Sequence, residues 1–291
     1  MTAPATLADV LAPAKLNLFL HVVGRRADGY HLLQSLFVLV DWCDTLHFER
    51  RADGRLARRD LGAPLPADDL CLRAAQALRN ASGTRWGVDI AIDKRVPASA
   101  GLGGGSSDAA TTLLALNRLW GLDWPRGRLL PLALSLGADV PFFVGGHNAF
   151  VEGIGERLTP VRVPAQWFAV LKPEAGIGTR SVFTHPLLAR DSRPAILSGS
   201  LEDAASWAAR QGRNDLQAAA EALCPDVTRA LRLLQERFGN GRMTGSGSAV
   251  FAGAGTGDRP VASLPAELPP GWVGRMCRSL EDHPLVGWVT D

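Results

Sequence analysis

The chain has 291 residues, 46% of them hydrophobic and 21% charged, with a formal net charge of +2. This is the composition of a globular protein, and the length favours two lobes over one core. The four scattered cysteines and six histidines lack zinc-ligand spacing, so we expect reduced thiols and no zinc site. Without a membrane-length apolar run or a signal-peptide pattern, we expect a cytoplasmic protein with no membrane partner.

The densest basic stretch, Glu49 to Arg59, contains five arginines and no aromatic residue. Nucleic-acid binding usually needs a broader basic field. We therefore interpret this stretch as the solvent-exposed rim of a hairpin and expect no nucleic-acid partner.

The first part of the chain predicts strands. Residues 16–23 and 32–40 are rich in apolar and β-branched residues, and Asp28-Gly29 between them is a strong hairpin signal. Residues 44–48 predict a further strand.

A helix and another strand follow. Residues 69–81 have apolar side chains at helical spacing, and Gly83 ends that helix. Residues 88–92 alternate in polarity, which predicts a strand that leads into the most informative segment of the chain.

That segment, residues 97–110, reads PASAGLGGGSSDAA. Glycines let backbone N–H groups converge on a ligand, and a helix that starts there adds unpaired N–H groups and the positive end of its dipole. We expect this helix to run from near Ser107 to Trp120 and to end at Gly121. A phosphate chain is the natural ligand of such a site, so the segment predicts a nucleotide-binding loop.

Other interpretations of the glycines fit less well. A flexible linker would not be followed by apolar residues at helical spacing. A Rossmann turn would need a third glycine where Ser106 stands, and an acidic ribose partner about 20 residues later is not well placed. No lysine follows the glycines, as a G-x-x-x-x-G-K-[ST] loop would require.

Next, a helix begins near Pro125, is disturbed by Pro131 and ends at Gly137. Residues 137–143 (GADVPFF) predict a short loop that leads to an extended segment.

From about Val161 the composition changes, and we place one domain at residues 1–160 and a second at 161–291. In the second, residues 167–172 predict a strand, and Ser200-Leu-Glu-Asp203 resembles a capping box that opens a helix to about Gln211. A further helix around Val227 to Leu234 ends at Gly239, and Thr244 to Ser248 forms another glycine-rich stretch before a strand. The fold class is therefore α+β with two lobes.

Three other features have modest meaning alone. Lys15 stands at the mouth of the first strand, where a solvent-facing lysine is common. Asp139 could simply cap a turn. Tyr30, the only tyrosine, adjoins His31 beside the predicted hairpin, and a stacking ring next to an imidazole suits a planar base.

In their order along the chain, four segments resemble the GHMP kinase superfamily. They read PAKLNLFLHVVGRRADGYHLLQSLF, IDKRVPASAGLGGGSSDAA, LGADVPFF and MTGSGSAVF, and together they span residues 13–251. The resemblance implies a two-lobed kinase with ATP as co-substrate, Mg²⁺, and a small-molecule alcohol as acceptor. The DGYH extension points to an acceptor that carries cytidine diphosphate.

The resemblance also implies residue roles. Asp139 would be the general base, with Lys15 beside it. ATP would contact Lys94, Pro97, Ala98, Ser99, Ala100, Gly101, Leu102, Gly103, Gly104, Gly105, Ser106 and Ser107, and Ser107 would also touch Mg²⁺. The acceptor would contact Asn17, Tyr30, His31, Thr179 and Phe183, and the third motif would be Gly245, Ser246 and Gly247.

Several points stay open. Another small alcohol or polyol could be the acceptor, or the chain could be a nucleotide sensor, although a sensor needs neither Lys15 nor Asp139. Asp69 stands where relatives commonly carry Asn near the adenine, and residues 177–183 keep Thr179 and Phe183 but differ between them. Both a monomer and a homodimer are compatible with the sequence.

Overall fold

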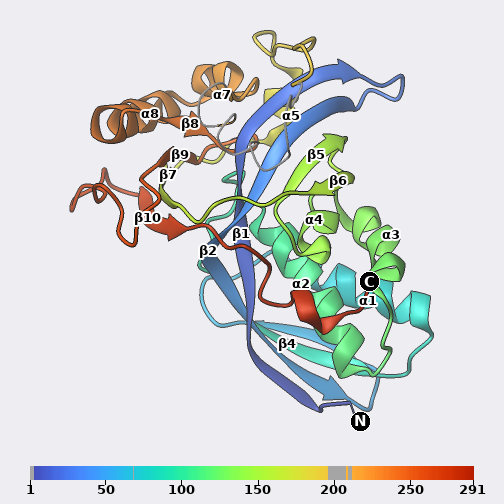
Figure 1. Cartoon of the computed structure of the whole chain (residues 1–291). Helices are drawn as coiled ribbons and strands as arrows, with labels where there is room; N and C mark the ends of the chain where they lie inside the picture. Colours follow the sequence, from blue (N-terminus) through green and yellow to red (C-terminus); the bar gives the residue numbers. More distant parts are fainter. Residues whose placement is uncertain (1–2, 68, 196–207, 209–211) are drawn as a thin grey trace.

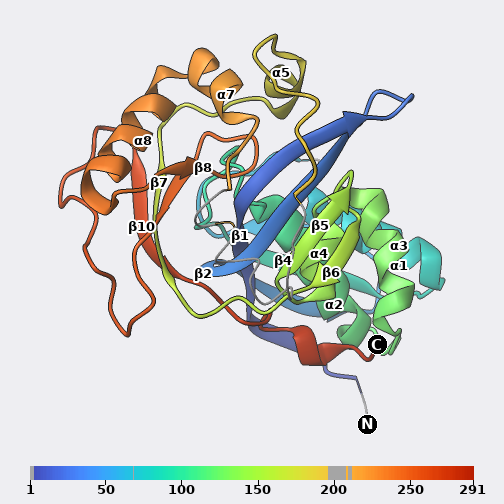
Figure 2. The ribbon, with the colours of Figure 1, turned by 45° about the horizontal axis from the view of Figure 1, so that its top comes forward.

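The computed structural model describes residues 3–67, 69–195, 208 and 212–291. Two β-sheets lie at its centre, with helices on the outer side of each (Figures 1 and 2). The strands of the larger sheet are β1 (Thr6–Arg25), β2 (His31–Arg51), β3 (Leu56–Asp60), β4 (Gly87–Asp93), β5 (Ala149–Gly153) and β6 (Arg157–Pro160). Their order is β3-β4-β2-β5-β6, and β1 pairs with β2.

The smaller sheet has the order β10-β7-β9-β8. Its strands are β7 (Trp167–Lys172), β8 (Arg242–Met243), β9 (Val250–Gly253) and β10 (Val273–Arg278). The helices are α1 (Leu70–Ser82), α2 (Gly104–Leu119), α3 (Arg126–Leu136) and α4 (Val140–Gly145) beside the larger sheet, and α5 (Thr179–Thr184), α7 (Gln217–Leu223) and α8 (Pro225–Phe238) in the second lobe. This α+β arrangement of two lobes confirms the predicted fold class.

The β1–β2 hairpin is confirmed, but its strands are much longer than predicted. Residues 44–48 are not a separate strand, because they continue β2. Burial explains the mixed sequence pattern. Residues 34–40 of β2 are all buried, since both faces are covered there, whereas residues 40–48 alternate between buried and partly exposed positions, as in a strand covered on one face.

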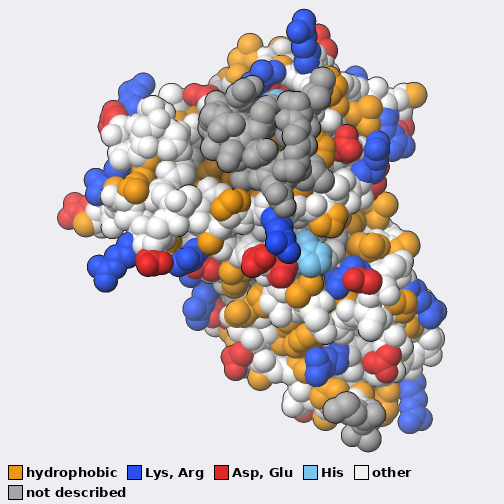
Figure 3. All heavy atoms as spheres, viewed as in Figure 1, with side chains coloured by type: hydrophobic (Ala, Val, Ile, Leu, Met, Phe, Trp, Pro, Cys, Tyr) orange, Lys and Arg blue, Asp and Glu red, His pale blue; other side chains and the backbone are white. Residues whose placement is uncertain are grey.

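The basic stretch at residues 49–59 does not form a hairpin. β4 lies between β2 and β3, and β3 pairs with β4 in parallel. The side chain of Arg58 is only 7% exposed, so its interpretation as part of a solvent-exposed rim is wrong. Over the described residues on the face shown in Figure 3, basic side chains alternate with acidic ones rather than forming a continuous field.

Most predicted helices are confirmed. α1 begins after Asp69, whose side chain accepts a hydrogen bond from the Leu72 amide at 2.8 Å, and it ends at the left-handed Gly83. α3 contains Pro131, as expected. α2 begins at Gly104 rather than near Ser107, because Gly103 takes the left-handed conformation directly before it.

The segment GADVPFF differs from the prediction. It does not lead straight into a strand, because residues 140–145 form the short helix α4, with Asp139 as its N-cap residue and a proline in its first turn. Proline is well tolerated there, since the first N–H groups of a helix have no partner within it. The Asp139 carboxylate makes no capping hydrogen bond, so it is left for other contacts.

In the second lobe, β7, α8 and β9 match the predicted strand, helix and strand. The helix predicted from the capping box at residues 200–203 lies, except for residue 208, outside the described residues. The chain then returns to the first lobe after β10, where Leu285 joins the core beneath the helices and the Arg126 amide donates to the Thr290 carbonyl at 2.7 Å.

Three clusters of buried apolar side chains hold these layers together. One lies between the larger sheet and α1 to α4, and a second lies between the two sheets, where Leu16 and Phe19 of β1 join Phe168 and Phe251. A third joins the smaller sheet to α7 and α8, which Figure 2 shows on its outer side. Within the described residues, no helix combines the length and apolar character that crossing a membrane requires.

Candidate active site

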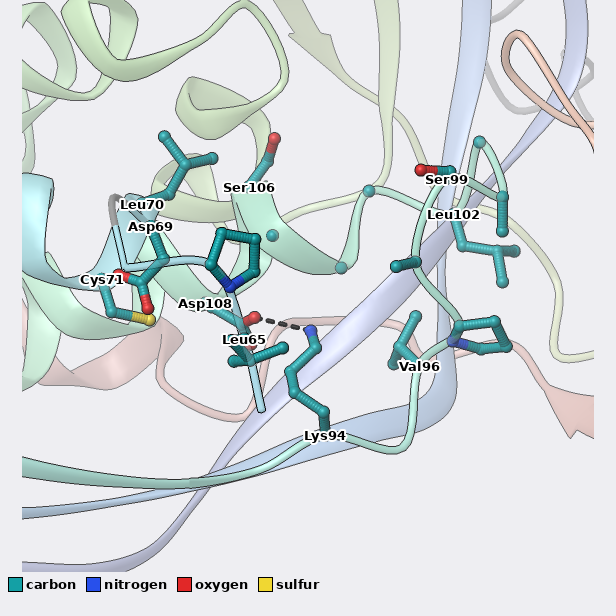
Figure 4. Close-up of a pocket in the computed structure, with 18 residues that line it drawn as sticks. Leu65, Asp69, Leu70, Cys71, Lys94, Val96, Ser99, Leu102, Ser106 and Asp108 are labelled. Atoms are coloured by element: carbon teal, nitrogen blue, oxygen red, sulfur yellow. Dashed lines mark hydrogen bonds and ion pairs between the residues drawn. The ribbon is translucent and has the colours of Figure 1, made fainter. Parts of the chain in front are cut away.

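A cleft of about 340 Å³ opens beside the glycine-rich loop, and we call it the loop cleft. Asp69, Leu70 and Cys71 lie on one side of it, and Val96 and Leu102 on the other (Figure 4). The structure brings together here all but one of the residues predicted to contact ATP: Lys94, Pro97, Ala98, Ser99, Ala100, Gly101, Leu102, Gly103, Gly104, Gly105 and Ser106. Ser107 is the exception, since it is fully buried and lines none of the cavities described below.

The start of α2 gives the loop cleft its anion-binding character. The first amide bonded within the helix is that of Ser107, which donates to the Gly103 carbonyl at 2.9 Å. The amides of Gly104, Gly105 and Ser106 precede this bond, and no side chain caps the helix. Unpaired N–H groups at the positive end of a 16-residue helix favour an anionic ligand.

Lys94 lines the loop cleft, but its ammonium group is already held by two carboxylates. It contacts Asp44 and lies 2.6 Å from Asp108 (Figure 4). Burial alone would lower the pKa of Lys94, but the two carboxylates outweigh it and raise that pKa. Burial raises the pKa of Asp108 to about 7, because one ammonium group cannot balance two buried carboxylates.

Asp44 also fixes the entry to the glycine-rich loop. Its Oδ1 atom accepts hydrogen bonds from the amides of Arg95, at 2.6 Å, and Val96, at 2.8 Å. Sequence analysis missed this role, because a single acidic residue inside an apolar strand gives no signal of its partner. Lys94 is thus part of the frame of the loop cleft as well as part of its lining.

A second cleft, of about 300 Å³, lies on the other side of the loop, and we call it the Lys15 cleft. It brings together predicted residues from distant parts of the chain. The predicted residues that line it are Lys15, Asn17, Ser99, Gly101, Gly103, Asp139, Thr179, Phe183, Gly245, Ser246 and Gly247.

Lys15 is 3% exposed and is surrounded by partners. Its Nζ atom lies 3.5 Å from Asp139 Oδ2, donates to Asn17 Oδ1, and stands 4.6 Å from the centre of the Phe37 ring. Its backbone amide donates to the Leu102 carbonyl of the glycine-rich loop at 2.9 Å. Burial lowers the pKa of Lys15, and the Asp139 carboxylate partly opposes that effect.

Asn17 connects Lys15 to the second lobe. Its Nδ2 atom donates to Ser35 Oγ at 3.0 Å, and its backbone amide donates to Thr244 Oγ1 at 2.9 Å. The Thr244 hydroxyl lies 3.3 Å from Asn17 Oδ1. Although Asn17 lines the Lys15 cleft, both polar atoms of its side chain already have partners in the protein, so it orients Lys15.

The two glycine-rich stretches touch where the lobes meet. A Cβ atom on Gly101 would lie 2.2 Å from the Thr244 carbonyl oxygen, and one on Gly245 would lie 2.8 Å from the Gly101 carbonyl oxygen. Both glycines have positive φ, +74° and +54°. Asn214 supports this contact, because its Nδ2 atom donates to the carbonyls of Met243 and Gly245, each at 2.8 Å. Nothing in the sequence around Asn214 signals that role.

A third cavity, of about 980 Å³, lies below the β1–β2 turn, and we call it the hairpin cavity. The rings of His31 and Phe183 stack there, 5.1 Å apart and 26° from parallel, and Tyr30 is 62% exposed. Burial, together with Arg25 and Arg190, lowers the pKa of His31, so its imidazole is neutral at pH 7.

Three arginines in the hairpin cavity were missed by sequence analysis: Arg25, Arg180 and Arg190. Arg25 donates to the Gly29 carbonyl at 3.1 Å, and Arg190 to the His185 carbonyl at 3.1 Å. Among the described residues, no carboxylate forms an ion pair with any of the three. Asp139 and Thr179 line both this cavity and the Lys15 cleft, so the two spaces adjoin.

Comparisons with known proteins agree with this arrangement. The sequence matches the GHMP kinases N terminal domain over residues 69–147 and the GHMP kinases C terminal domain over residues 192–260. It is 63% identical to 4-diphosphocytidyl-2-C-methyl-D-erythritol kinase of Methylibium petroleiphilum, covering 97% of this chain and 98% of that protein. It is 57% identical to the protein of that name from Albidiferax ferrireducens, with 98% and 96% covered.

Solved structures agree as well. A crystal structure of 4-(cytidine 5'-diphospho)-2C-methyl-D-erythritol kinase superimposes with a TM-score of 0.71 at 36% identity, over 86% of this chain and 90% of that one. Homoserine kinase from Cytophaga hutchinsonii superimposes with a TM-score of 0.68 at 18% identity, over 97% of each chain, and shares the fold.

The contact between the two glycine-rich stretches gives a first prediction. Gly101→Ala places a methyl group against the Thr244 carbonyl in a conformation that alanine disfavours, so we expect it to destabilise the protein by about 1–3 kcal/mol. Thermal unfolding should show a drop of several degrees in Tm, at about 2–4 °C per kcal/mol. Gly127→Ala is the control, because a Cβ atom there meets nothing within 4 Å. Equal Tm values for the two variants would contradict the contact.

Proposed function

Because this chain belongs to the GHMP kinases, and within them to the 4-diphosphocytidyl-2-C-methyl-D-erythritol kinases, we propose that its three adjoining cavities hold the two substrates of that reaction. The enzyme transfers the γ-phosphoryl group of ATP to the 2-hydroxyl of 4-diphosphocytidyl-2-C-methyl-D-erythritol, a step that supplies isoprenoid precursors by the non-mevalonate route. ATP occupies the loop cleft, and the acceptor spans the Lys15 cleft and the hairpin cavity.

The observation that carries this assignment is the ion pair between the buried Lys15 and Asp139, whose side chain is 32% exposed, with Lys15 Nζ 3.5 Å from Asp139 Oδ2. Both residues line a cleft that shares Ser99, Gly101 and Gly103 with the loop cleft. A phosphate chain on one side of the loop and a hydroxyl on the other would therefore meet beside this pair. A protein that only sensed a nucleotide would gain nothing from keeping a lysine buried at such a point.

In this proposal Asp139 acts as the general base. As the acceptor oxygen bonds to the γ-phosphorus, the bond to the ADP oxygen breaks and the hydroxyl proton passes to the Asp139 carboxylate. Lys15 stabilises the negative charge that develops on the acceptor and phosphoryl oxygens, and it donates to Asn17, which holds it in place. Because Lys15 is buried, its attraction to the developing negative charge is stronger than it would be in water.

The residues of the loop cleft fit an ATP phosphate chain. The amides of Gly104, Gly105 and Ser106 would bind its oxygens, and a Cβ atom on Gly104 would press on Val96 at 3.0 Å and narrow that side of the cleft. Lys94, which lines the same cleft, would lie close to the adenosine.

Mg²⁺ prefers oxygen ligands and keeps several waters. Among the described residues, no three acidic, His or Cys side chains gather to hold a metal, so the ion would bind mainly through the ATP phosphates and neutralise part of their charge. The Ser107 hydroxyl is buried and has no hydrogen-bond partner among the described residues. Although Ser107 does not line the loop cleft, it lies in the first turn of α2 directly after Ser106, which does, so we keep it as the candidate protein ligand.

The hairpin cavity suits the cytidine diphosphate part of the acceptor. The stacked rings of His31 and Phe183, with Tyr30 beside them, offer flat surfaces for the cytosine. The Nε2 atom of the neutral His31 imidazole is buried and has no hydrogen-bond partner in the described ranges, so it could bind the polar edge of the cytosine. Arg25, Arg180 and Arg190, which have no carboxylate partner within the described part of the chain, would balance the diphosphate.

Asp139→Asn tests the general base. We expect kcat to fall by about 10²–10⁴-fold, because the amide cannot accept the proton, while both KM values change little. Steady-state ADP release measures this effect. Asp226→Asn, on the surface of α8, is the control. Unchanged turnover in Asp139→Asn would rule Asp139 out as the base.

Lys15 gives a pH prediction. Catalysis needs its ammonium form, and burial lowers its pKa, so the proton is lost at a lower pH than in an ordinary lysine. We therefore expect kcat to fall on the alkaline side as pH rises through that lowered pKa. Arginine stays protonated there, so the residual activity of Lys15→Arg should remain level over the same range. The same alkaline decline in the wild type and in Lys15→Arg would show that another group causes the decline.

Arg180→Ala tests the diphosphate contact. Loss of one charge-assisted contact should raise KM for the cytidine diphosphate acceptor about tenfold and leave KM for ATP unchanged. Arg26→Ala is the matched control, because Arg26 pairs with Asp28 at 2.7 Å and does not line the hairpin cavity. An equal effect of the two substitutions would contradict the assignment.

A further inference from the structure

We propose that Arg58 is a positioning residue for nucleotide binding, which shapes the adenine-side wall of the loop cleft through Asp69 and the loop at residues 61–67. This inference rests on the proposed binding of ATP in the loop cleft. Arg58 lies on β3 and is absent from the lining of that cleft. Its effect therefore passes through the residues that it holds.

The guanidinium group of Arg58 has a full set of partners. Its Nε atom donates to Asp60 Oδ1 at 2.7 Å and its Nη2 atom to Asp60 Oδ2 at 3.2 Å, a bidentate pair. The Nη2 and Nη1 atoms also donate to the carbonyls of Leu65, at 3.1 Å, and Pro66, at 3.0 Å, and Nη1 forms an ion pair with the carboxylate of Asp69. Leu65, Pro66 and Asp69 all line the loop cleft.

Asp60 completes the arrangement from the other end of the loop. Its Oδ2 atom accepts a hydrogen bond from the Leu65 amide at 2.9 Å. Burial opposes ionisation of Asp60, yet the bonds from Leu65 and Arg58 hold its pKa below the usual range. One arginine and one aspartate of β3 thus fix both polar groups of the Leu65 backbone.

This network explains an unusual feature of the sequence. Asp69 carries a negative charge at a position where an asparagine would be neutral. Its side chain is only 13% exposed, so this charge is largely removed from solvent. One carboxylate oxygen caps α1 through the Leu72 amide, and the other meets Arg58. The aspartate is stable at this position because the positive charge of Arg58 balances its negative charge. The two residues therefore form a unit, whereas an asparagine at residue 69 would need no cationic partner.

The same contacts limit what Asp69 does for the nucleotide. Since both carboxylate oxygens already have contacts in the protein, Asp69 contributes to the adenine-side wall of the cleft and not to a direct bond with the base. By capping α1, it also holds Leu70 and Cys71 in place at the start of that helix (Figure 4). A shift of this wall by a fraction of an ångström would weaken binding of the base without moving Lys15 or Asp139.

Arg58→Met tests the proposal, since methionine keeps much of the side-chain volume and removes the charge and the donors. We expect KM for ATP, and Kd for a non-hydrolysable ATP analogue measured by calorimetry, to rise about tenfold or more. KM for the acceptor and kcat at saturating ATP should stay within about threefold. Arg58→Lys keeps the charge but loses the bidentate geometry. Its affinity for ATP should therefore lie between those of the wild type and Arg58→Met.

The double variant Arg58→Met/Asp69→Asn separates positioning from a general loss of stability. Asparagine still caps α1 but needs no cation, so it should recover part of the lost ATP affinity. Recovery would be incomplete, because the carbonyls of Leu65 and Pro66 still lack their donor. If the double variant binds the analogue no better than Arg58→Met, the Arg58–Asp69 unit is disproved.

Arg51→Met is the matched control. Arg51 also pairs with two carboxylates, those of Asp53 and Asp89, each at 2.6 Å, but it does not line the loop cleft. The ATP affinity of Arg51→Met should equal that of the wild type. Wild-type ATP affinity in Arg58→Met would overturn the inference, whereas a wild-type protein that binds the analogue without phosphorylating the acceptor would overturn the proposed function alone.

Discussion

The buried ammonium group of Lys15 is the interaction on which the rest of the structure depends. A charged amine that is 3% exposed is stable only with partners on several sides. Asp139 supplies one from the start of α4, Asn17 a second from β1 itself, and the Phe37 ring a third from β2. These elements can meet only if the long β1–β2 hairpin and the helix layer are both in place.

Asn17 carries this requirement from the first lobe to the second. Its contact with Thr244 places one glycine-rich stretch beside the other, and Gly101 and Gly245 approach so closely that neither tolerates a side chain. The pair of Lys15 and Asp139 therefore lies near the junction of the two lobes, and the glycine-rich loop lines both the loop cleft and the Lys15 cleft. In the proposed function, the contacts that stabilise the junction would also align the two substrates.

The sequence predicted the chemical parts of this site better than their supports. Lys15, Asp139 and the glycine-rich loop could be found because each stands in a short motif with its own residue pattern. Asp44, Asn214 and Arg58 could not, since each acts through a partner at least ten residues away in the chain or on another element. The length of β2 was also missed, because its burial changes from two faces to one along a single strand. α4 was missed because a proline in a first helical turn resembles one in a loop.

In the proposed function, a phosphoryl group passes at this junction from ATP to the 2-hydroxyl of the cytidine diphosphate acceptor. The most direct measurement is ³¹P NMR of a reaction that contains the enzyme, ATP, Mg²⁺ and 4-diphosphocytidyl-2-C-methyl-D-erythritol. We expect one new phosphate monoester for each ADP formed, with the diphosphate signals of the acceptor retained. ADP with free phosphate in place of the monoester, or no ADP at high enzyme concentration, would contradict it.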